Sequence, residues 1–155
     1  MIRRSLVRLA LLASVVAVPV ASAQAPAVSD SGIKATSAIM RVSLYRYADG
    51  MQQAALDDMR THLIPVWEAQ RVAGTIVNYS TMTNTTASSK DDWQFGIVLT
   101  YKNWAAIDSL GARNGPITLK HYGSAAARTA AGEARAKMRI LVSTNLINAS
   151  TYSRP

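Results

Sequence analysis

The sequence contains no cysteine, only two histidines and a single phenylalanine among its 155 residues. Without cysteine the chain has no disulfide, no thiolate nucleophile and no sulfur ligand for a metal. The two histidines have no partners at metal-ligand spacing, and phosphate-loop, dinucleotide and serine-hydrolase motifs are absent. We therefore expect no dedicated metal site and no cofactor. A chain of this size is long enough to be stabilised by its own hydrophobic core.

Only one long apolar run occurs, at residues 9–20. Arginines at positions 3, 4 and 8 precede it, and the small residues Ala21-Ser22-Ala23 follow it. About twelve residues are too few to cross a bilayer, which takes ~20. This pattern is typical of a cleavable signal peptide, with cleavage after Ala23. We therefore expect a periplasmic or secreted bacterial protein with no stable membrane insertion. The arginine pair leaves both the general secretory route and the twin-arginine route open.

After cleavage the chain retains fourteen basic and nine acidic residues, because three arginines leave with the signal peptide. This moderate positive charge is spread along the chain. A nucleic-acid-binding protein typically has a clustered basic face with interleaved aromatic residues. The composition therefore predicts no nucleic-acid partner.

The mature chain divides into two parts. Residues 24–37 are rich in alanine, serine and proline and lack periodicity, so we expect a flexible tether. Residues 38–155 form a single predicted domain. Alternating patterns predict strands at 38–47, 75–82 and 93–101, and β-branched residues suggest a closing strand at 146–152.

Helical periodicity predicts a helix over 51–73, kinked at Pro65, because proline lacks an N–H for the carbonyl of residue 61. Asn103 is a candidate cap for a short helix at 104–110, which Gly111 should end. The alanine-rich segment 124–139 is a third predicted helix. On it, Arg128, Arg135 and Arg139 form one stripe, read either as a solvated face or as a surface for an anionic partner.

The resulting order is βαββαβ, the pattern of an α+β ferredoxin-like sandwich. Four segments resemble the dimeric α/β-barrel superfamily, which includes antibiotic-biosynthesis-monooxygenase-like and stress-response barrel proteins. They are Tyr45–Tyr47, His62–Trp67, Ala73–Gly74 and Phe95–Ala106. The resemblance implies an antiparallel sheet with helices on one face, and a homodimer in which two sheets face each other to form a barrel with a cavity in each half.

The third predicted strand has two distinct faces. Its aromatic and aliphatic side, Trp93 to Tyr101, should lie beneath the helices. We expect the opposite sheet face to collect polar side chains that converge on a small organic ligand: Arg41, Tyr45, Tyr47, Asn78 and Gln94. Arg41 would bind an anionic group of that ligand. Alternatively, these residues only solvate the sheet or contact a second protomer.

His62 is the best candidate for acid–base catalysis, because histidine exchanges protons near neutral pH. Asp58, four residues earlier on the same helix side, is placed to orient its ring. Tyr45 is a second candidate for proton transfer. The simpler interpretation is a surface Asp–His pair without a function.

These patterns favour an exported, homodimeric α/β-barrel protein of unassigned activity that binds a small organic molecule in a cavity between sheet and helices. One alternative is a cofactor-independent, monooxygenase-like enzyme. Another is a structural or interaction protein that uses its sheet face only for dimerisation. Whether the protein is an enzyme stays open at this point.

Overall fold

The computed structural model describes residues 33–152. Its elements are β1 (Ile33–Tyr47), α1 (Gln52–Asp58), the π-helical turn η1 (Met59–Leu63), α2 (Ile64–Val72), β2 (Asn78–Thr83), β3 (Phe95–Tyr101), α3 (Trp104–Asp108), α4 (Leu110–Tyr122), α5 (Ala125–Met138) and β4 (Arg139–Tyr152). The predicted signal peptide, 1–23, and residues 24–32 of the predicted tether lie outside the described residues. Among the helices of the described part, none is long and apolar enough to span a membrane.

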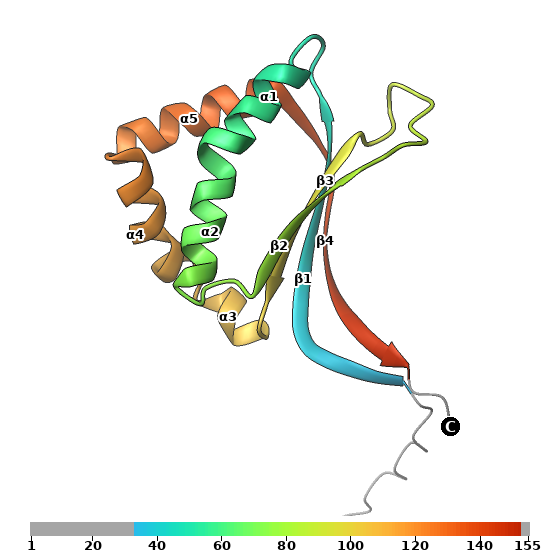
Figure 1. Ribbon diagram of the computed structural model, residues 1–155, viewed down its shortest axis with the longest axis vertical. Coiled ribbons are helices and arrows are strands. Elements are labelled where there is room, and N and C mark those ends of the chain that lie inside the picture. Colours follow the sequence, from blue (N-terminus) through green and yellow to red (C-terminus); the bar gives the residue numbers. More distant parts are fainter. Residues whose placement is uncertain (1–32, 153–155) are drawn as a thin grey trace, which may run out of the picture. The chain divides into compact units, whose positions relative to one another are not determined.

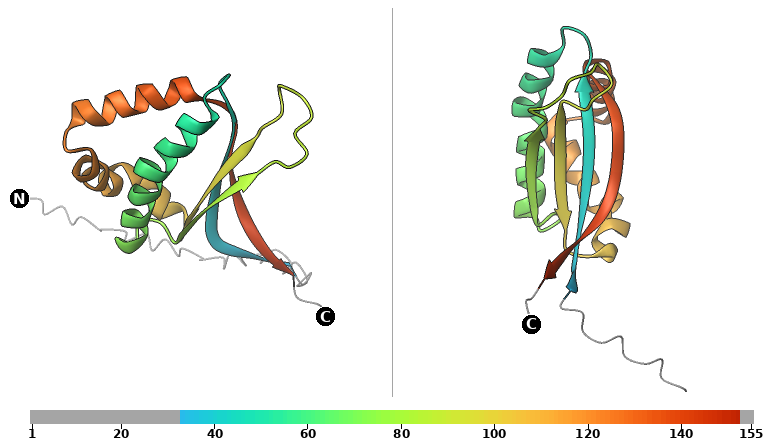
Figure 2. Two further views of the ribbon diagram at one scale, coloured as in Figure 1. Left: turned by 45° about the horizontal axis from the view of Figure 1, so that its top comes forward. Right: turned by 90° about the vertical axis from the view of Figure 1, so that its right-hand side faces the viewer.

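The four strands form one antiparallel sheet in the order β2-β3-β1-β4. The helices lie on one side of this sheet, as Figures 1 and 2 show. This is the predicted α+β, ferredoxin-like arrangement. Each helical region of the predicted order consists of several segments: α1, η1 and α2 before β2, and α3, α4 and α5 after β3. The first and third strands of the prediction are neighbours at the centre of the sheet, which confirms the pairing on which the predicted architecture depends.

The core lies between β3 and the helical segments η1 and α2. Phe95, Ile97, Leu99 and Tyr101 alternate along β3 and are all buried. They pack in one cluster with Trp67 from α2 and with Met59 and Ile76. Burying a side chain of this size stabilises the fold by roughly 1.5–3 kcal/mol relative to leaving it exposed. This cluster therefore fixes the sheet against α2.

The helix over residues 52–72 continues through Pro65 by way of a π-helical turn. The Ile64 N–H donates to the Met59 carbonyl, five residues earlier, and η1 joins α1 to α2 without a break. Instead of the predicted kink at Pro65, the structure has this wider turn just before the proline. A π-turn of this kind reorients the side chains that it contains, and such turns often occur at functional sites. His62 lies within it.

Several element boundaries differ from the predictions. β1 begins at Ile33 rather than at residue 38, and β4 begins at Arg139 rather than at 146, because the two strands pair with each other along their length. Gly111 does not end the helix; α4 continues through it to Tyr122 and ends at Gly123, whose φ is +77°. Glycine positions and strand propensities are local features of the sequence, so they do not predict pairing between distant strands such as β1 and β4.

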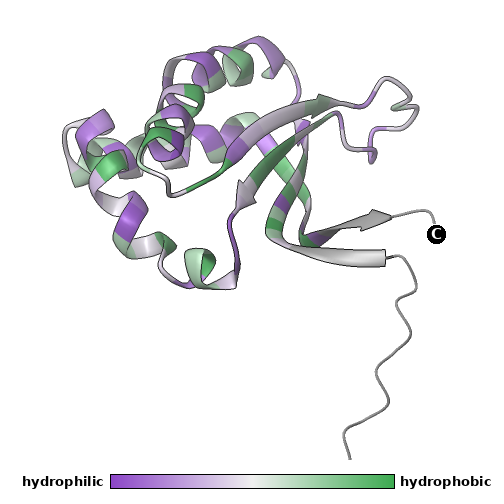
Figure 3. Ribbon diagram, turned by 60° about the horizontal axis from the view of Figure 1, so that its bottom comes forward, coloured by the Kyte–Doolittle hydropathy of each residue, from purple (hydrophilic) through white to green (hydrophobic). Residues whose placement is uncertain are grey.

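The side chains of β1 lie on the face opposite to the one predicted. Arg41, Ser43 and Tyr45 pair with Leu99, Ile97 and Phe95, so they share the helix-covered face. Figure 3 shows hydrophobic and hydrophilic residues interspersed along the sheet. A register difference of one residue exchanges the faces of an entire strand. The outer face instead presents mainly apolar and uncharged side chains: Met40, Val42, Leu44, Met82, Val98 and Ile147, with Asn78, Ser80, Asn145 and Thr100.

Candidate functional site

A buried ion pair connects α1 with α5. Arg135 donates to both carboxylate oxygens of Asp58, at 2.6 and 2.9 Å, and also to the Tyr122 hydroxyl at 2.9 Å. Both partners are largely shielded, with side chains 15% and 10% exposed. Burial on its own lowers the pKa of Arg135, but the hydrogen bonds that Arg135 donates to Asp58 and Tyr122 outweigh it and hold that pKa above its ordinary value. Arg135 therefore keeps its charge, and its ion pair with Asp58 positions α5.

The two histidines of the chain meet beside this ion pair. His62 Nδ1 and His121 Nε2 lie 3.0 Å apart, although 59 residues separate them in sequence. Their rings are nearly perpendicular, and the Tyr122 ring packs against both of them. Asp58 contacts Arg135 and not His62, so the expected Asp58–His62 pair is replaced by a His62–His121 pair.

An open groove lies between α5 and the start of β4. Its volume is about 420 Å³, and it is lined by Tyr45, Gly132, Arg135, Ala136, Arg139 and Leu141. The Arg139 guanidinium lies over the Tyr45 ring, 4.4 Å from its centre. Leu141 is 54% exposed on this face. The groove thus combines a cation, an aromatic ring and an exposed aliphatic side chain.

Arg139 has an unusual electrostatic environment for an arginine. Among the residues that the structure describes, no carboxylate forms an ion pair with it. Burial is the main cause that lowers the pKa of Arg139, and the like charge of Arg135 acts in the same direction. Tyr45 and Asp58 act in the opposite direction, although neither forms an ion pair with Arg139. A partly desolvated cation without an ion-pair partner among the described residues attracts an anion.

Arg41 and Tyr101 form a second contact on the same helix-covered face. The Arg41 guanidinium lies 5.8 Å from the centre of the Tyr101 ring. Tyr101 is only 1% exposed, and within the described part of the chain its hydroxyl has no hydrogen-bond partner. Burial raises the pKa of Tyr101, although the charge of Arg41 opposes this. The phenol is therefore neutral and available to donate a hydrogen bond.

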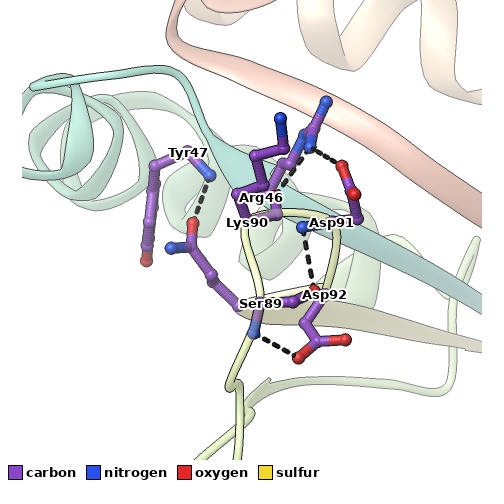
Figure 4. A network of polar contacts seen from close by, with 7 residues as sticks. Arg46, Tyr47, Ser89, Lys90, Asp91 and Asp92 are labelled. Carbon is purple, nitrogen blue, oxygen red and sulfur yellow. Dashed lines mark hydrogen bonds and ion pairs between the residues drawn. The ribbon is translucent and has the colours of Figure 1, made fainter.

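Polar contacts join the 84–94 hairpin to the end of β1 near Arg46 and Tyr47 (Figure 4). The Gln94 side-chain oxygen accepts from the Tyr47 N–H at 2.7 Å. Arg46 donates to the Lys90 carbonyl at 2.7 Å and to Asp91 at 3.1 Å. Gln94 is therefore engaged in joining the hairpin to the end of β1.

The structure brings some of the predicted ligand-binding residues together and separates others. Arg41, Tyr45 and Tyr47 share the helix-covered face, and Tyr45 lines the groove beside α5. Asn78 is exposed on the outer face, and Gln94 lies in the hairpin contact. The five residues do not converge on one surface, because the helices cover the face of β1 that carries Arg41, Tyr45 and Tyr47, whereas Asn78 of β2 faces outward.

The sequence singles out Arg135 and Arg139 but does not place them in a site. It predicts them, with Arg128, as one stripe on a single helix, whereas α5 ends at Met138 and Arg139 begins β4. Only Arg128 is exposed; Arg135 and Arg139 are half-buried. The signal that was available is the absence of acidic residues near Arg139 in the sequence.

Comparisons with known proteins bear on the fold only. No protein-family model matches the sequence, and no curated protein matches it. Among solved structures, it is similar to a dimeric protein of unknown function and ferredoxin-like fold from Bacteroides fragilis, at 14% identity and a TM-score of 0.44, covering 76% of this chain and 100% of that one.

Two further similar structures are those of named proteins. HapK from Hahella chejuensis matches at 12% identity with a TM-score of 0.46, over 76% of this chain and 99% of that chain. The hydroxynitrile lyase from Passiflora edulis matches at 13% identity with a TM-score of 0.46, over 76% and 97%. The ferredoxin-like fold follows from the strand order and pairing of this chain itself, and the monooxygenase-like or stress-response type stays a prediction.

Proposed function

We propose that the protein is an exported homodimer that binds a small organic anion in the groove between α5 and the β1–β4 pair. The observation that supports this most strongly is Arg139, a partly buried cation that has no carboxylate partner among the described residues and lines an open groove. A carboxylate on the ligand would accept two hydrogen bonds from the guanidinium fork.

The rest of the groove favours an anion with an aromatic or aliphatic body. Tyr45 lies beneath Arg139, and Leu141 is exposed beside it. Gly132 and Ala136 on α5 are small, so they leave room for a flat ligand. The volume of about 420 Å³ falls within the range of ligand pockets, roughly 300–1,000 Å³.

Benzoate and its neutral analogue benzamide test this proposal by isothermal titration calorimetry. We expect benzoate to bind more tightly than benzamide. The variant Arg139→Gln should weaken benzoate binding roughly ten- to a hundredfold, since hydrogen bonds to charged groups contribute about 1.5–3 kcal/mol. Binding of benzamide should not change.

Arg128→Gln is the matched control, because it removes the same charge from the exposed side of α5. It should bind benzoate as the unaltered protein does. Equal benzoate affinity in the Arg139 and Arg128 variants, or the absence of benzoate binding to the unaltered protein, would contradict an anion site at Arg139.

The outer face of the sheet supports the homodimer. The residues that face outward from its four strands are largely apolar and uncharged, and Ile140 and Ile147 are 44% and 43% exposed. In the described part of the chain no helix covers this face. A nearly uncharged face is self-complementary, as a two-fold interface between identical protomers requires. An apolar sheet face of this kind is normally covered.

Native mass spectrometry and light scattering test the assembly. Val42 lies at the centre of the outer face, paired with Val98 and Asn145. We expect a dimer for the unaltered protein and a monomer for Val42→Glu, because a buried unpaired carboxylate opposes association. Thr86→Glu in the exposed hairpin should leave the dimer intact. A monomeric unaltered protein would contradict this part of the proposal.

Export rests on the N-terminal sequence alone. If the protein is secreted through a cleaved signal peptide, the intact mass of material recovered from the periplasm should correspond to a chain that begins at Gln24. Material that begins at Met1 and stays in the cytoplasm would contradict export without affecting the anion site.

A further inference from the structure

The only two imidazoles of the chain face each other. His62 belongs to η1 and His121 to the last turn of α4, and their Nδ1 and Nε2 atoms are 3.0 Å apart. The π-turn before Pro65 turns His62 toward α4, while the packing of Tyr122 against both rings limits their movement. The anion groove does not use this pair.

We propose that His62 and His121 together bind a divalent transition-metal ion, with Cu²⁺ as the preferred ion. Imidazole nitrogens bind such ions at about 2.0–2.1 Å. Two nitrogens held 3.0 Å apart would subtend an angle of about 94° at a shared ion with bonds of that length. In the structure the two nitrogens share a hydrogen bond, so an ion would displace the proton between them. A small rotation of each ring against Tyr122 would then direct both lone pairs at the ion.

Both the ligand type and this angle are relevant to the choice of metal. A tetrahedral zinc site needs about 109°, which would separate the two nitrogens by about 3.3 Å. An angle near 90° is instead that of neighbouring ligands in the square-planar or tetragonal sites typical of Cu²⁺ and Ni²⁺. Cu²⁺ also binds nitrogen ligands more tightly than the other first-row divalent ions. The higher affinity of Cu²⁺ for nitrogen ligands therefore favours this ion, and an angle near 90° is compatible with it.

The surroundings of the pair are compatible with a cation. Arg135, the nearest guanidinium of the ion-pair cluster, is neutralised by Asp58. His62 and His121 are both half-buried, and His62 also lines an open groove of about 290 Å³ with Asp57, Asp58 and Thr61. Within residues 33–152, no set of three potential ligands from histidine, cysteine or carboxylate side chains gathers. The remaining coordination positions would therefore be filled by water or by an exogenous ligand.

Titration of the purified, metal-free protein with Cu²⁺ against a chromophoric chelator tests the proposal. We expect one ion per chain, and at least about a tenfold loss of affinity in both His62→Gln and His121→Gln, since even the loss of a supporting residue costs a metal site 10–100-fold. Lys120→Gln is the matched control: it changes an exposed residue adjacent to His121 and should bind Cu²⁺ unchanged. Zn²⁺ should bind more weakly than Cu²⁺.

The electron paramagnetic resonance spectrum of the Cu²⁺-loaded, unaltered protein provides a test that does not depend on any variant folding correctly. Two imidazole nitrogens should split the copper signal, because the chain has no other imidazole and no thiolate. A spectrum with oxygen ligands only, or equal Cu²⁺ affinity in the two histidine variants and the unaltered protein, would overturn the proposal.

Discussion

Arg135 on α5 donates two hydrogen bonds to Asp58 at the end of α1, a residue 77 positions earlier in the chain. No side chain of α5 is fully buried, so apolar packing alone does not hold this alanine-rich helix. The ion pair fixes the end of α5 from which β4 and Arg139 follow. The anion groove and the orientation of the helix thus depend on the same contact.

The first prediction concerns this ion pair. Arg135→Met leaves the Asp58 carboxylate shielded and without its partner, so we expect the free energy of unfolding to fall by about 3 kcal/mol. The double variant Asp58→Leu/Arg135→Met should recover much of that loss, because it removes the unpaired charge. Urea denaturation monitored by circular dichroism measures both values.

Arg128→Met is the control for this experiment, because it removes an exposed arginine from the same helix. Its stability should stay within about 0.5 kcal/mol of the unaltered protein. If the Arg135 and Arg128 variants are equally stable, the Asp58–Arg135 pair does not anchor α5.

The second prediction concerns the start of α3. The Asn103 side-chain oxygen accepts from the Ala106 N–H at 3.0 Å, which confirms the predicted cap. Asn103→Ala should lower the free energy of unfolding by about 1 kcal/mol, because it leaves that N–H without its partner. Asn103→Asp retains the acceptor and should be nearly neutral. Equal losses in both variants would show that the cap is not the cause.

Much of the fold was predictable because it is recorded in local patterns. The alternation from Phe95 to Tyr101 identifies a strand with one buried side, and the Asn103 cap marks the start of a helix. The order of the elements then restricts the fold to the ferredoxin-like class. The full extent of β4 was not predictable, because it depends on pairing with β1 more than a hundred residues earlier.

The candidate site was less predictable, for a geometric reason. Alternation along β1 defines two faces but does not say which one the helices cover; that depends on its register with β3. The His62–His121 contact joins two helices that the sequence does not place side by side. Likewise, the sequence around Asp58 does not show that its partner is the distant Arg135 and not the nearby His62.

The third prediction concerns close packing on the outer face of the sheet. A Cβ atom at Gly96 would lie 2.7 Å from the Met82 Cε atom and 3.0 Å from the Leu44 Cδ2 atom. Gly96→Ala should therefore cost about 1–3 kcal/mol of stability, as overpacking does. In a Met82→Ala background the cost should be smaller, since the nearest contact is gone. An equal cost in both backgrounds, measured by urea denaturation, would assign the effect to the backbone instead.

The fourth prediction concerns pH and the 84–94 hairpin. The backbone N–H groups of Ser88 and Ser89 donate to one Asp92 carboxylate oxygen at 2.8 and 2.9 Å. The hydrogen bond from Ser89, followed by that from Ser88, lowers the pKa of Asp92 below its ordinary value of 3.8.

A carboxyl group with a lowered pKa in the folded state stabilises that state when the pH is above the unfolded pKa. This contribution is lost as the pH falls below 3.8 and through the lowered pKa of Asp92. We therefore expect Asp92→Asn to be less stable than the unaltered protein at neutral pH. The difference should shrink in that acidic range, because the carboxyl group then becomes neutral in both states.

Thermal unfolding of both proteins across this pH range measures the difference, and carboxyl-detected NMR titration of the unaltered protein gives the pKa of Asp92 directly. A stability difference that does not vary with pH would show that the charge of Asp92 is not what orders the hairpin. Because Gln94 and Arg46 connect the same hairpin to the end of β1, loss of this order should also broaden the amide resonance of Tyr47.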